Sequence, residues 1–224
     1  MDKEILQVYF ICGTANCPEG KFLEILEAAF KSGVTCFQFR EKGANALKGD
    51  EKVVLARKVK ELCRKYQIPL IINDDVDLAL ELDADGIHLG QDDLPITKAR
   101  QLFPNKIIGL SVGSTIEYQQ SAVGLVDYIG VGPIFPTSSK NDAGEVIGLK
   151  GLNDVRDYDK EIPIVAIGGI TFGDVAAIKQ SGADGVAVIS AIAQSKQVEV
   201  DTQRLSSCSV SYTHLRAHET ELHL

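Results

Sequence analysis

The sequence predicts a single (β/α)8 barrel of the TIM type, followed by a C-terminal tail that lies outside the barrel. Eight short runs rich in Val, Ile, Leu and Phe alternate with amphipathic helical segments over roughly 190 residues, the count and order that this fold requires. The runs show little polar alternation, as expected of strands buried on both faces of a parallel sheet. A repeated segment also favours the barrel, because Asp83–Ile87 recurs as Gly182–Val186 four strand–helix units later. The competing fold is a doubly wound open sheet, which usually has fewer strands.

The expected strands follow one another along the chain as Val8–Cys12, Cys36–Phe39, Leu70–Ile72, Gly86–Leu89, Ile107–Ser111, Tyr128–Val131, Ile164–Ile167 and Gly185–Ile189. Helical spacing is clearest in Phe22–Lys31 and Glu51–Tyr66. In the second of these segments, apolar and basic residues are predicted to lie on opposite faces of the helix. The apolar residues are Val54, Leu55 and Leu62, and the basic ones are Lys58 and Lys65. Gly33 and Gly182 mark the ends of helices.

Composition excludes several classes of protein. The 224 residues include 23 basic and 31 acidic ones, so the net charge is −8. No basic stripe rises above this background, which argues against a nucleic acid or an anionic membrane as a partner. No apolar run approaches the ~20 residues of a membrane span, and the charged start, Met1–Glu4, is unlike a signal peptide. The five cysteines are odd in number and form no Cys-x-x-Cys motif, so we expect a reduced, cytoplasmic protein.

The C-terminal part of the sequence departs from the barrel pattern. Helical periodicity weakens after Ala193, so the closing helix of the barrel is poorly defined in sequence. We expect a barrel domain over residues 1–205 and a tail over 206–224 that is disordered or translated from vector sequence. The histidines His214, His218 and His223 in this tail could be read as a metal cluster, but we assign them no function.

Polar residues follow most of the expected strands, at the end of the barrel where catalytic groups collect in this fold. The second strand runs into Gln38–Lys42, and the third and fourth lead to Asn73-Asp74 and to Asp93. The fifth ends at Ser111, and the later strands lead to Gly132–Lys140, Gly168-Gly169 and Ser190.

These residues predict two anion sites. Asp74 and Asp93 come from neighbouring strands, and two carboxylates suit a Mg²⁺ ion that completes its shell with water and substrate phosphates. Cationic side chains that could neutralise a diphosphate converge on the same cavity from Arg40, Lys42 and Lys140. Backbone N–H groups after the last two strands form the usual phosphate site of the barrel. One site with metal and one without metal point to two phosphorylated small-molecule substrates.

Each residue also has a purely structural interpretation. Asp74 or Asp75 could cap the next helix, and Asp93 could belong to a turn. Arg40–Lys42 could be a solvated charge run, Gly168-Gly169 an ordinary turn, and His88 a packed, hydrogen-bonded histidine. What weighs against these interpretations is that all of these residues occur at the carboxyl ends of strands.

The motifs, taken together and in order, resemble those of the thiamine-phosphate synthase family. The resemblance runs from about Val8 to Ala193 and rests on five motifs, which are Gln38–Lys42, Asn73-Asp74, Gly86–Asp93, Gly132–Lys140 and Gly168–Ile170. The family joins 4-amino-5-hydroxymethyl-2-methylpyrimidine diphosphate to 4-methyl-5-hydroxyethylthiazole phosphate. The products are thiamine phosphate and diphosphate. The resemblance also makes a homo-oligomer plausible.

The resemblance implies a role for each matching residue. The pyrimidine diphosphate would be held by Gln38, Phe39, Arg40, Glu41, Lys42, Asn73, Ser111 and Lys140. Mg²⁺ would be bound by Asp74 and Asp93. The thiazole phosphate would be held by Thr137, Ser138, Ser139, Gly169, Ile189 and Ser190. The catalytic residues would be Arg40, Lys42, Ser111 and Lys140, which stabilise a departing diphosphate. Two segments rich in small polar residues, Gly43–Asp50 and Pro136–Ile147, are expected to act as mobile lids.

Three other functions fit the fold less well. Thiazole tautomerase-like relatives lack the diphosphate and metal motifs, whereas this chain has Arg40, Lys42, Asp74 and Asp93. A phosphosugar isomerase or epimerase would share the glycine-rich phosphate site but would need a general base pair instead of a diphosphate site. A non-catalytic phosphate sensor would not need the full set of cations and metal ligands.

Overall fold

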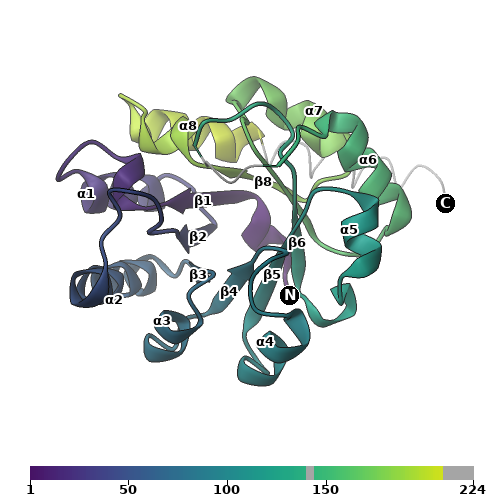
Figure 1. Cartoon of the computed structure of the whole chain (residues 1–224). Coiled ribbons are helices and arrows are strands. Elements are labelled where there is room, and N and C mark those ends of the chain that lie inside the picture. The colour runs from purple at the N-terminus through teal and green to yellow at the C-terminus, as the bar shows by residue number, and fades with distance from the viewer. Residues whose placement is uncertain (140–143, 209–224) are drawn as a thin grey trace.

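A computed structural model describes residues 1–139 and 144–208, and it confirms the predicted barrel (Figure 1). Eight parallel strands form a closed ring in sequence order, with β1 also paired to β8. Their bounds are β1 Val8–Cys12, β2 Cys36–Phe39, β3 Leu70–Asn73, β4 Gly86–Leu89, β5 Ile107–Val112, β6 Tyr128–Val131, β7 Ile164–Ile167 and β8 Gly185–Val188. Every expected strand is present, and the largest difference in its bounds is a single residue at the carboxyl end.

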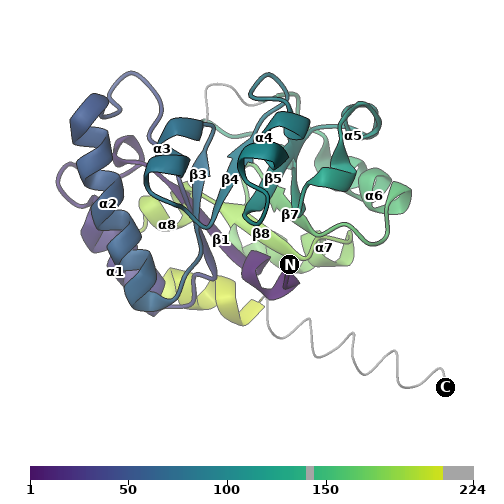
Figure 2. The same cartoon turned by 90° about the horizontal axis from the view of Figure 1, so that it is seen from below.

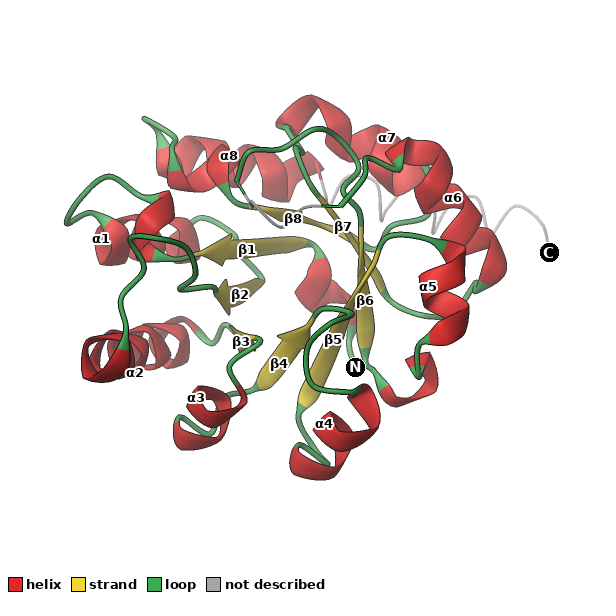
Figure 3. Ribbon diagram, in the orientation of Figure 1, coloured by secondary structure: helices red, strands yellow, loops and turns green. Residues whose placement is uncertain are grey.

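Helices surround the ring of strands (Figure 3). The α-helices are α1 Phe22–Lys31, α2 Gly49–Tyr66, α3 Val76–Glu81, α4 Ile96–Leu102, α5 Thr115–Gln120, α6 Gly148–Tyr158, α7 Val175–Gln180 and α8 Ser190–Ala193. Short 3₁₀ turns are η1 Lys3–Leu6, η2 Thr14–Asn16, η3 Val123–Leu125 and η4 Phe172–Asp174. None of the helices in the described part of the chain is long and apolar enough to cross a membrane.

The predicted apolar face of α2 was wrong in one respect. Val54 is 54% exposed, and the buried line of this helix is Ala56, Val59 and Cys63. Residues spaced three and four apart share one face of a helix, and this set places the small Ala56 against the barrel. The bulkier Leu55 and Leu62 lie at the edge of that face and are only partly buried.

The strands separate two apolar cores because successive side chains point to opposite faces. The larger core lies between the strands and the helices. The smaller fills the inside of the barrel with Leu6, Tyr9, Ile11, Cys36, Ile71, Tyr128, Val165, Ala187 and Ile189. Burial on both sides explains why the strands lack polar alternation in the sequence.

The amino end of the barrel is closed by a repeated contact. An aspartate just before a strand turns back and its Oδ2 accepts a hydrogen bond from a backbone N–H near the start of the preceding strand. The pairs are Asp85 with Leu70, Asp127 with Ile108, and Asp184 with Ile164, each at 2.8 Å. The repeated Ala-Asp-Gly sequence has its physical origin here. A Cβ at Gly86 or Gly185 would lie within 2.3 Å of a backbone carbonyl oxygen.

Two of these aspartates are further held by an arginine. Arg100 Nη2 lies 2.7 Å from Asp127 Oδ2, and Arg156 Nη2 lies 2.9 Å from Asp184 Oδ2. The other guanidinium nitrogens donate to backbone carbonyls, from Arg100 to Leu125, Phe103 and Lys106, and from Arg156 to Gly182, Asp159 and Ile162. We call these two arginine–aspartate units the amino-end clamps.

The closing helix, which the sequence left poorly defined, is formed. Residues 198–208 are helical and lie beside α1 in the outer layer of helices (Figure 2). Thr202 and Leu205 are fully buried, and Thr202 Oγ1 donates to the carbonyl of Val198 at 2.7 Å, which satisfies the hydroxyl inside the core. The helix continues past the expected boundary at residue 205. The rest of the expected tail, including the three histidines, lies outside the described residues.

Candidate active site

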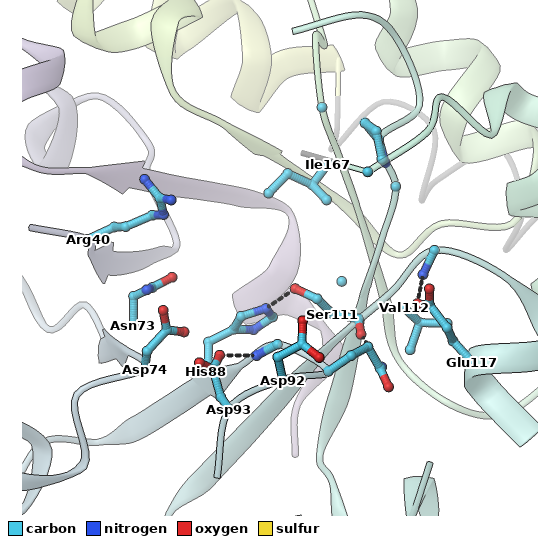
Figure 4. Close-up of a pocket in the computed structure, with 18 of the residues that line it drawn as sticks. Arg40, Asn73, Asp74, His88, Asp92, Asp93, Ser111, Val112, Glu117 and Ile167 are labelled. Carbon is cyan, nitrogen blue, oxygen red and sulfur yellow. Dashed lines mark hydrogen bonds between the residues drawn. The ribbon is translucent and has the colours of Figure 1, made fainter. Parts of the chain in front are cut away.

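A cavity of about 500 Å³ opens at the carboxyl end of the barrel. Its lining includes residues that the sequence predicted for the diphosphate and metal site, namely Arg40, Lys42, Asn73, Asp74, Asp93 and Ser111. Figure 4 shows Arg40, Asp74 and Ser111 facing the same space from three different strand ends. The structure therefore brings together residues that are up to 71 positions apart in the sequence.

A smaller cavity of about 30 Å³ adjoins the first and shares Thr137, Ile167 and Gly168 with it. Its lining contains most of the residues predicted for the second phosphate, namely Thr137, Ser139, Gly169, Ile189 and Ser190. Ser138 is described but does not line this cavity. Lys140, which was predicted to reach the diphosphate, lies outside the described residues.

The turn beside the smaller cavity requires glycine. Gly168 and Gly169 have φ angles of 102° and 62°, in the left-handed region that favours this residue. A Cβ on Gly168 would lie 2.5 Å from Pro133, and one on Gly169 would lie 2.4 Å from the carbonyl oxygen of Pro136. Phe135 N–H donates to the carbonyl of Gly168 at 3.0 Å, so the loops after β6 and β7 are hydrogen-bonded to each other.

Asp74 is held in an unusual conformation at the rim of the larger cavity. Its φ is 59°, and its Oδ2 accepts a hydrogen bond from Lys42 Nζ at 2.9 Å. Burial raises the pKa of Asp74 above its usual range; Lys42 opposes this, and the neighbouring Asp93 adds to it. Asp93 in turn accepts the N–H of Gly90 at 2.6 Å. The two carboxylates thus lie close together (Figure 4).

This carboxylate pair fits a magnesium ion. Carboxylate oxygens are the ligands that Mg²⁺ prefers, and two of them leave the remaining positions of its octahedron to water or phosphate oxygens. Within residues 1–139 and 144–208, no group of three or more His, Cys, Asp and Glu side chains could hold a metal by itself. A cation bound to Asp74 and Asp93 must therefore take other ligands from solvent, from amides or from a phosphorylated substrate.

Asp75 has the structural role that the sequence could not separate from that of its neighbour. Its Oδ1 accepts the N–H of Leu78 at 3.0 Å, which caps α3, and its Oδ2 binds Lys52 Nζ at 2.6 Å. Burial alone would raise the pKa of Asp75, but the hydrogen bonds from Lys52 and Leu78 outweigh it and lower the pKa. Of the two adjacent aspartates, one caps a helix and the other faces the cavity.

The five residues of the Gln38–Lys42 motif divide between cavity and core. Arg40 and Lys42 line the cavity, whereas Phe39 faces the outer core, with its ring centroid 6.2 Å from that of Phe22. Glu41 is buried, and its carboxylate accepts hydrogen bonds from the backbone and side chain of Thr14 and from the N–H of Leu47. Glu41 therefore organises the loops on either side of the motif.

A hydrogen-bonded chain inside the barrel ends at Ser111. Gln38 Nε2 donates to Tyr9 Oη at 2.9 Å, and Tyr9 Oη lies 2.6 Å from Tyr128 Oη. His88 Nδ1 lies 2.9 Å from Tyr128 Oη, and His88 Nε2 lies 2.9 Å from Ser111 Oγ. The second histidine contact is visible in Figure 4. His88 is thus a packed, hydrogen-bonded histidine, and it also fixes the orientation of a cavity residue.

Sequence reasoning missed several members of this arrangement. Tyr9 and Tyr128 are fully buried, and burial raises the pKa of both phenols well above its usual range. Their signal in the sequence is a phenol on a strand position that faces the barrel interior. Glu117 was also missed; it lines the cavity, and its Oε2 accepts the N–H of Gly113 at 2.7 Å. No motif marks it in the sequence.

Fold and site together define a (β/α)8 barrel with a polar cavity at the carboxyl ends of its strands, the architecture of an enzyme of the TIM-barrel class. Residues 8–192 match the sequence profile of thiamine monophosphate synthase. A "Thiamine-phosphate synthase" of Streptococcus suis is 59% identical over 196 residues, covering 88% of this chain and 86% of the relative. A "Thiamine-phosphate synthase 1" of Streptococcus pneumoniae is 51% identical over 204 residues, covering 91% of this chain and 98% of the relative. The chain therefore belongs to the thiamine monophosphate synthase family.

A solved structure agrees with this assignment. The "Thiamine phosphate pyrophosphorylase" of Pyrococcus furiosus superposes with a TM-score of 0.82 at 35% identity, covering 93% of this chain and 98% of that one. A 3-hexulose-6-phosphate synthase structure superposes with a TM-score of 0.68 at 14% identity, which shows a shared fold only. The predicted enzyme class, a transferase of thiamine biosynthesis, is confirmed by the relatives.

Proposed function

We propose that the chain couples 4-amino-5-hydroxymethyl-2-methylpyrimidine diphosphate to 4-methyl-5-hydroxyethylthiazole phosphate. The products are thiamine phosphate and diphosphate. The observation that carries this proposal is the pair of adjoining cavities. The larger is lined by Arg40, Lys42 and two carboxylates, and the smaller by hydroxyl groups and the Gly168-Gly169 turn. Two differently built anion sites that share a wall suit a reaction between two phosphorylated substrates.

The larger cavity suits the pyrimidine diphosphate. Arg40 and Lys42 supply positive charge for the diphosphate, with Lys140 as a further predicted contact. Asn73 and Ser111 supply neutral hydrogen-bonding groups in the same cavity. In the smaller cavity, Thr137, Ser139 and Ser190 offer hydroxyl groups to the thiazole phosphate.

Asp74 and Asp93 would hold Mg²⁺ in this scheme. Bound there, the ion would act as a Lewis acid that neutralises charge on the diphosphate oxygens. Lys42 already lies 2.9 Å from Asp74, so this lysine can bridge the metal ligands and the diphosphate. The same lysine thereby links the metal site with the Gln38–Lys42 motif.

The chemistry is dissociative. The bond between the pyrimidine methylene carbon and the diphosphate oxygen breaks first, and its electron pair leaves with the diphosphate. The resulting pyrimidine-methylene cation is stabilised by the ring amino group, and the thiazole nitrogen then attacks the methylene carbon. Arg40 and Lys42 stabilise the negative charge that grows on the leaving group, which is the main electrostatic task of the site. No protein nucleophile is needed for either step.

His88 and Ser111 would contribute by orientation. Ser111 is the one member of the buried hydrogen-bonded chain that faces the diphosphate cavity with a hydroxyl group. Its hydrogen bond with His88 fixes the direction of that hydroxyl, so less freedom is lost when the substrate binds. Water must be kept from the cation, a task that we assign to the loop after β2, whose Leu47 N–H is bound by Glu41.

The proposal is tested by measuring diphosphate release from the purified protein with both substrates and Mg²⁺. We expect release only when both substrates and the metal are present, with thiamine phosphate formed in equal amount. Reactions with one substrate, and reactions with EDTA, serve as controls. Binding of thiazole phosphate without any turnover would contradict the proposal and favour a phosphate sensor.

Cytoplasmic location and a homo-oligomeric state remain predictions. Cell fractionation would check the first, and light scattering would check the second.

A further inference from the structure

Two cysteines lie in contact beside the active-site motif, and the proposed chemistry uses neither. Cys12 is the last residue of β1, and Cys17 follows the 3₁₀ turn Thr14–Asn16. The turn folds the chain back on itself, because Cys17 N–H donates to the carbonyl of Thr14 and Gly13 N–H donates to Asn16 Oδ1. As a result, Cys12 Sγ and Cys17 Sγ are 3.4 Å apart.

The two thiols are not equivalent. Cys12 is completely buried, and its S–H can be shared between Cys17 Sγ and the carbonyl of Gly13. Cys17 is partly exposed at the surface of the turn. The hydrogen bond from Cys12 lowers the pKa of the Cys17 thiol, against opposing effects of burial and of Glu41, while burial raises the pKa of Cys12. One thiol is accessible and more acidic, and the other lies behind it.

The segment Cys12–Cys17, which carries both thiols, is bound directly to the Gln38–Lys42 motif. Arg40 N–H donates to the carbonyl of Cys12 at 3.0 Å, and a Cβ on Gly13 would lie 2.1 Å from the carbonyl oxygen of Arg40. Thr14, between the two cysteines, donates its N–H to Glu41 Oε2 at 2.8 Å and its hydroxyl to Glu41 Oε1. A change in this turn therefore acts on Arg40 and on the loop that Glu41 holds.

We propose that Cys12 and Cys17 form a peroxide-sensitive dithiol site at the edge of the active site. The Cys17 thiolate attacks hydrogen peroxide, the O–O bond breaks, and Cys17 sulfenic acid and hydroxide form. The Cys12 thiol then attacks the Cys17 sulfur, a disulfide forms, and the sulfenic oxygen leaves as water after taking up a proton. Two thiols are oxidised in total, and one peroxide is reduced to two waters.

Disulfide formation requires the two sulfurs, now 3.4 Å apart, to approach to about 2.05 Å, and we expect the Thr14–Asn16 segment between them to shift as they do. Because Thr14 is bound to Glu41, that shift weakens the support of the diphosphate cavity. The effect on the diphosphate cavity rests on the proposed function, whereas the formation of the disulfide does not.

The disulfide is tested on the intact, reduced protein without any activity assay. After treatment with one equivalent of hydrogen peroxide, we expect the count of free thiols to fall from five to three and the mass to fall by about 2 Da. Peptide mapping should place the bond between Cys12 and Cys17, and dithiothreitol should reverse it. The matched control Cys208→Ser removes an exposed cysteine and should give the same intramolecular bond.

Two variants separate the roles of the thiols. Cys12→Ala should stop at a sulfenic acid on Cys17 that dimedone traps, and Cys17→Ser should leave Cys12 unreacted. Oxidation of Cys208 alone, or a Cys17 that proceeds to sulfinic acid in the wild-type protein, would overturn the proposal.

The coupling between the dithiol and the diphosphate cavity is tested by measuring the binding of inorganic diphosphate with Mg²⁺ by calorimetry. The oxidised protein should bind diphosphate about fivefold more weakly, the loss expected for one hydrogen bond. Equal affinity would overturn the coupling and leave the dithiol site intact.

Discussion

The two ends of the barrel use the same residue type in opposite ways. At the amino end, Asp127 and Asp184 are each held by an arginine and by a backbone N–H, so their charges are balanced within the protein. At the carboxyl end, Asp74 and Asp93 lie close to each other, and the closeness of Asp93 is one cause of the raised pKa of Asp74. Charge matched inside the chain stabilises the fold, whereas at the carboxyl end, where Lys42 offsets Asp74 but Asp93 lies close by, we propose that a bound cation balances the remaining negative charge.

Positive φ angles occur at both ends of the barrel, at Gln67 and Asp83 before strands and at Asp74 after one, so the contrast lies in how the aspartates are paired. Asp74 and the pair Gly168-Gly169 have positive φ angles at the carboxyl end, where a non-glycine residue in this region is strained. At the amino end, the aspartates of the clamps have ordinary backbone conformations and close a hydrogen-bonded network. Substitutions at the two ends should therefore separate activity from stability.

The largest effect is expected at the carboxyl end. Asp93→Asn keeps the hydrogen bond to Gly90 N–H but removes one charge of the carboxylate pair. If Asp93 is a metal ligand, as proposed, kcat/KM should fall by about 100-fold to 1,000-fold, because such a ligand contributes several kcal/mol to charge stabilisation in the transition state. The thermal midpoint should stay equal or rise slightly, since a like-charge contact is relieved. Steady-state diphosphate release and thermal unfolding measure the two quantities. A variant that loses stability and keeps its activity would reverse the comparison.

At the amino end, the opposite result is expected. Arg156→Met removes the guanidinium that binds Asp184 and three backbone carbonyls, and it leaves a largely buried carboxylate to the more distant Lys3, whose Nζ lies 3.6 Å from Asp184 Oδ1. The free energy of unfolding should fall by about 3 kcal/mol. The Michaelis constants should change less than twofold, because Arg156 lies at the other end of the barrel from the cavity. Urea denaturation followed by circular dichroism gives the stability, and Arg100→Met should behave alike.

Asp75 tests the comparison within a single pair of neighbours. Asp75→Ala removes the cap of α3 and the contact with Lys52, so stability should fall by about 1 kcal/mol while activity is kept. Because the folded pKa of Asp75 is lowered, its stabilising effect is present above the unfolded pKa of about 3.9 and is lost as the pH falls through the folded value. Thermal midpoints at several pH values should show a wild-type advantage at pH 7 that shrinks below about pH 4. A pH-independent difference would contradict this reasoning.

The smallest effect concerns the independence of the two clamps. Arg100 and Arg156 bind different aspartates and share no hydrogen-bond partner. The double variant Arg100→Met/Arg156→Met should lose the sum of the two single losses to within about 0.5 kcal/mol. Urea denaturation of all four proteins measures the coupling energy. A larger coupling would mean that the amino end acts as one network and not as two separate units.

The strands could be predicted almost completely, because burial on both faces leaves a continuous apolar run that sequence reading detects. The buried face of α2 was harder to predict. Its buried line passes through the small Ala56 and Cys63, so hydrophobicity alone favoured the exposed Val54 instead. The closing helix was poorly defined in the sequence because one of its buried positions is Thr202, whose polar hydroxyl is satisfied by its own helix.

In the site, residue types at strand ends were enough to place Arg40, Lys42, Asp74 and Asp93 in one cavity. They were not enough to separate Asp74 from Asp75, because two adjacent aspartates have the same capping chemistry, and the backbone turn after β3 decides which one faces the cavity. The interior chain through Tyr9 and Tyr128 depends on which side chains point into the barrel. That information requires the register of strands far apart in the sequence.

The pairing of β1 with β8 has a consequence for how the chain is made. Val8 is paired with Val186, so the first strand acquires its second neighbour only after nearly the whole barrel has left the ribosome. Until then a nascent chain carries an unpaired edge on β1 and another on its most recent strand, and such edges readily join those of other chains. This contact also has the greatest sequence separation in the sheet, which makes ring closure costly in chain entropy and slow. Translation that pauses or stops before Val186 would yield an open sheet prone to aggregation, and not a smaller enzyme.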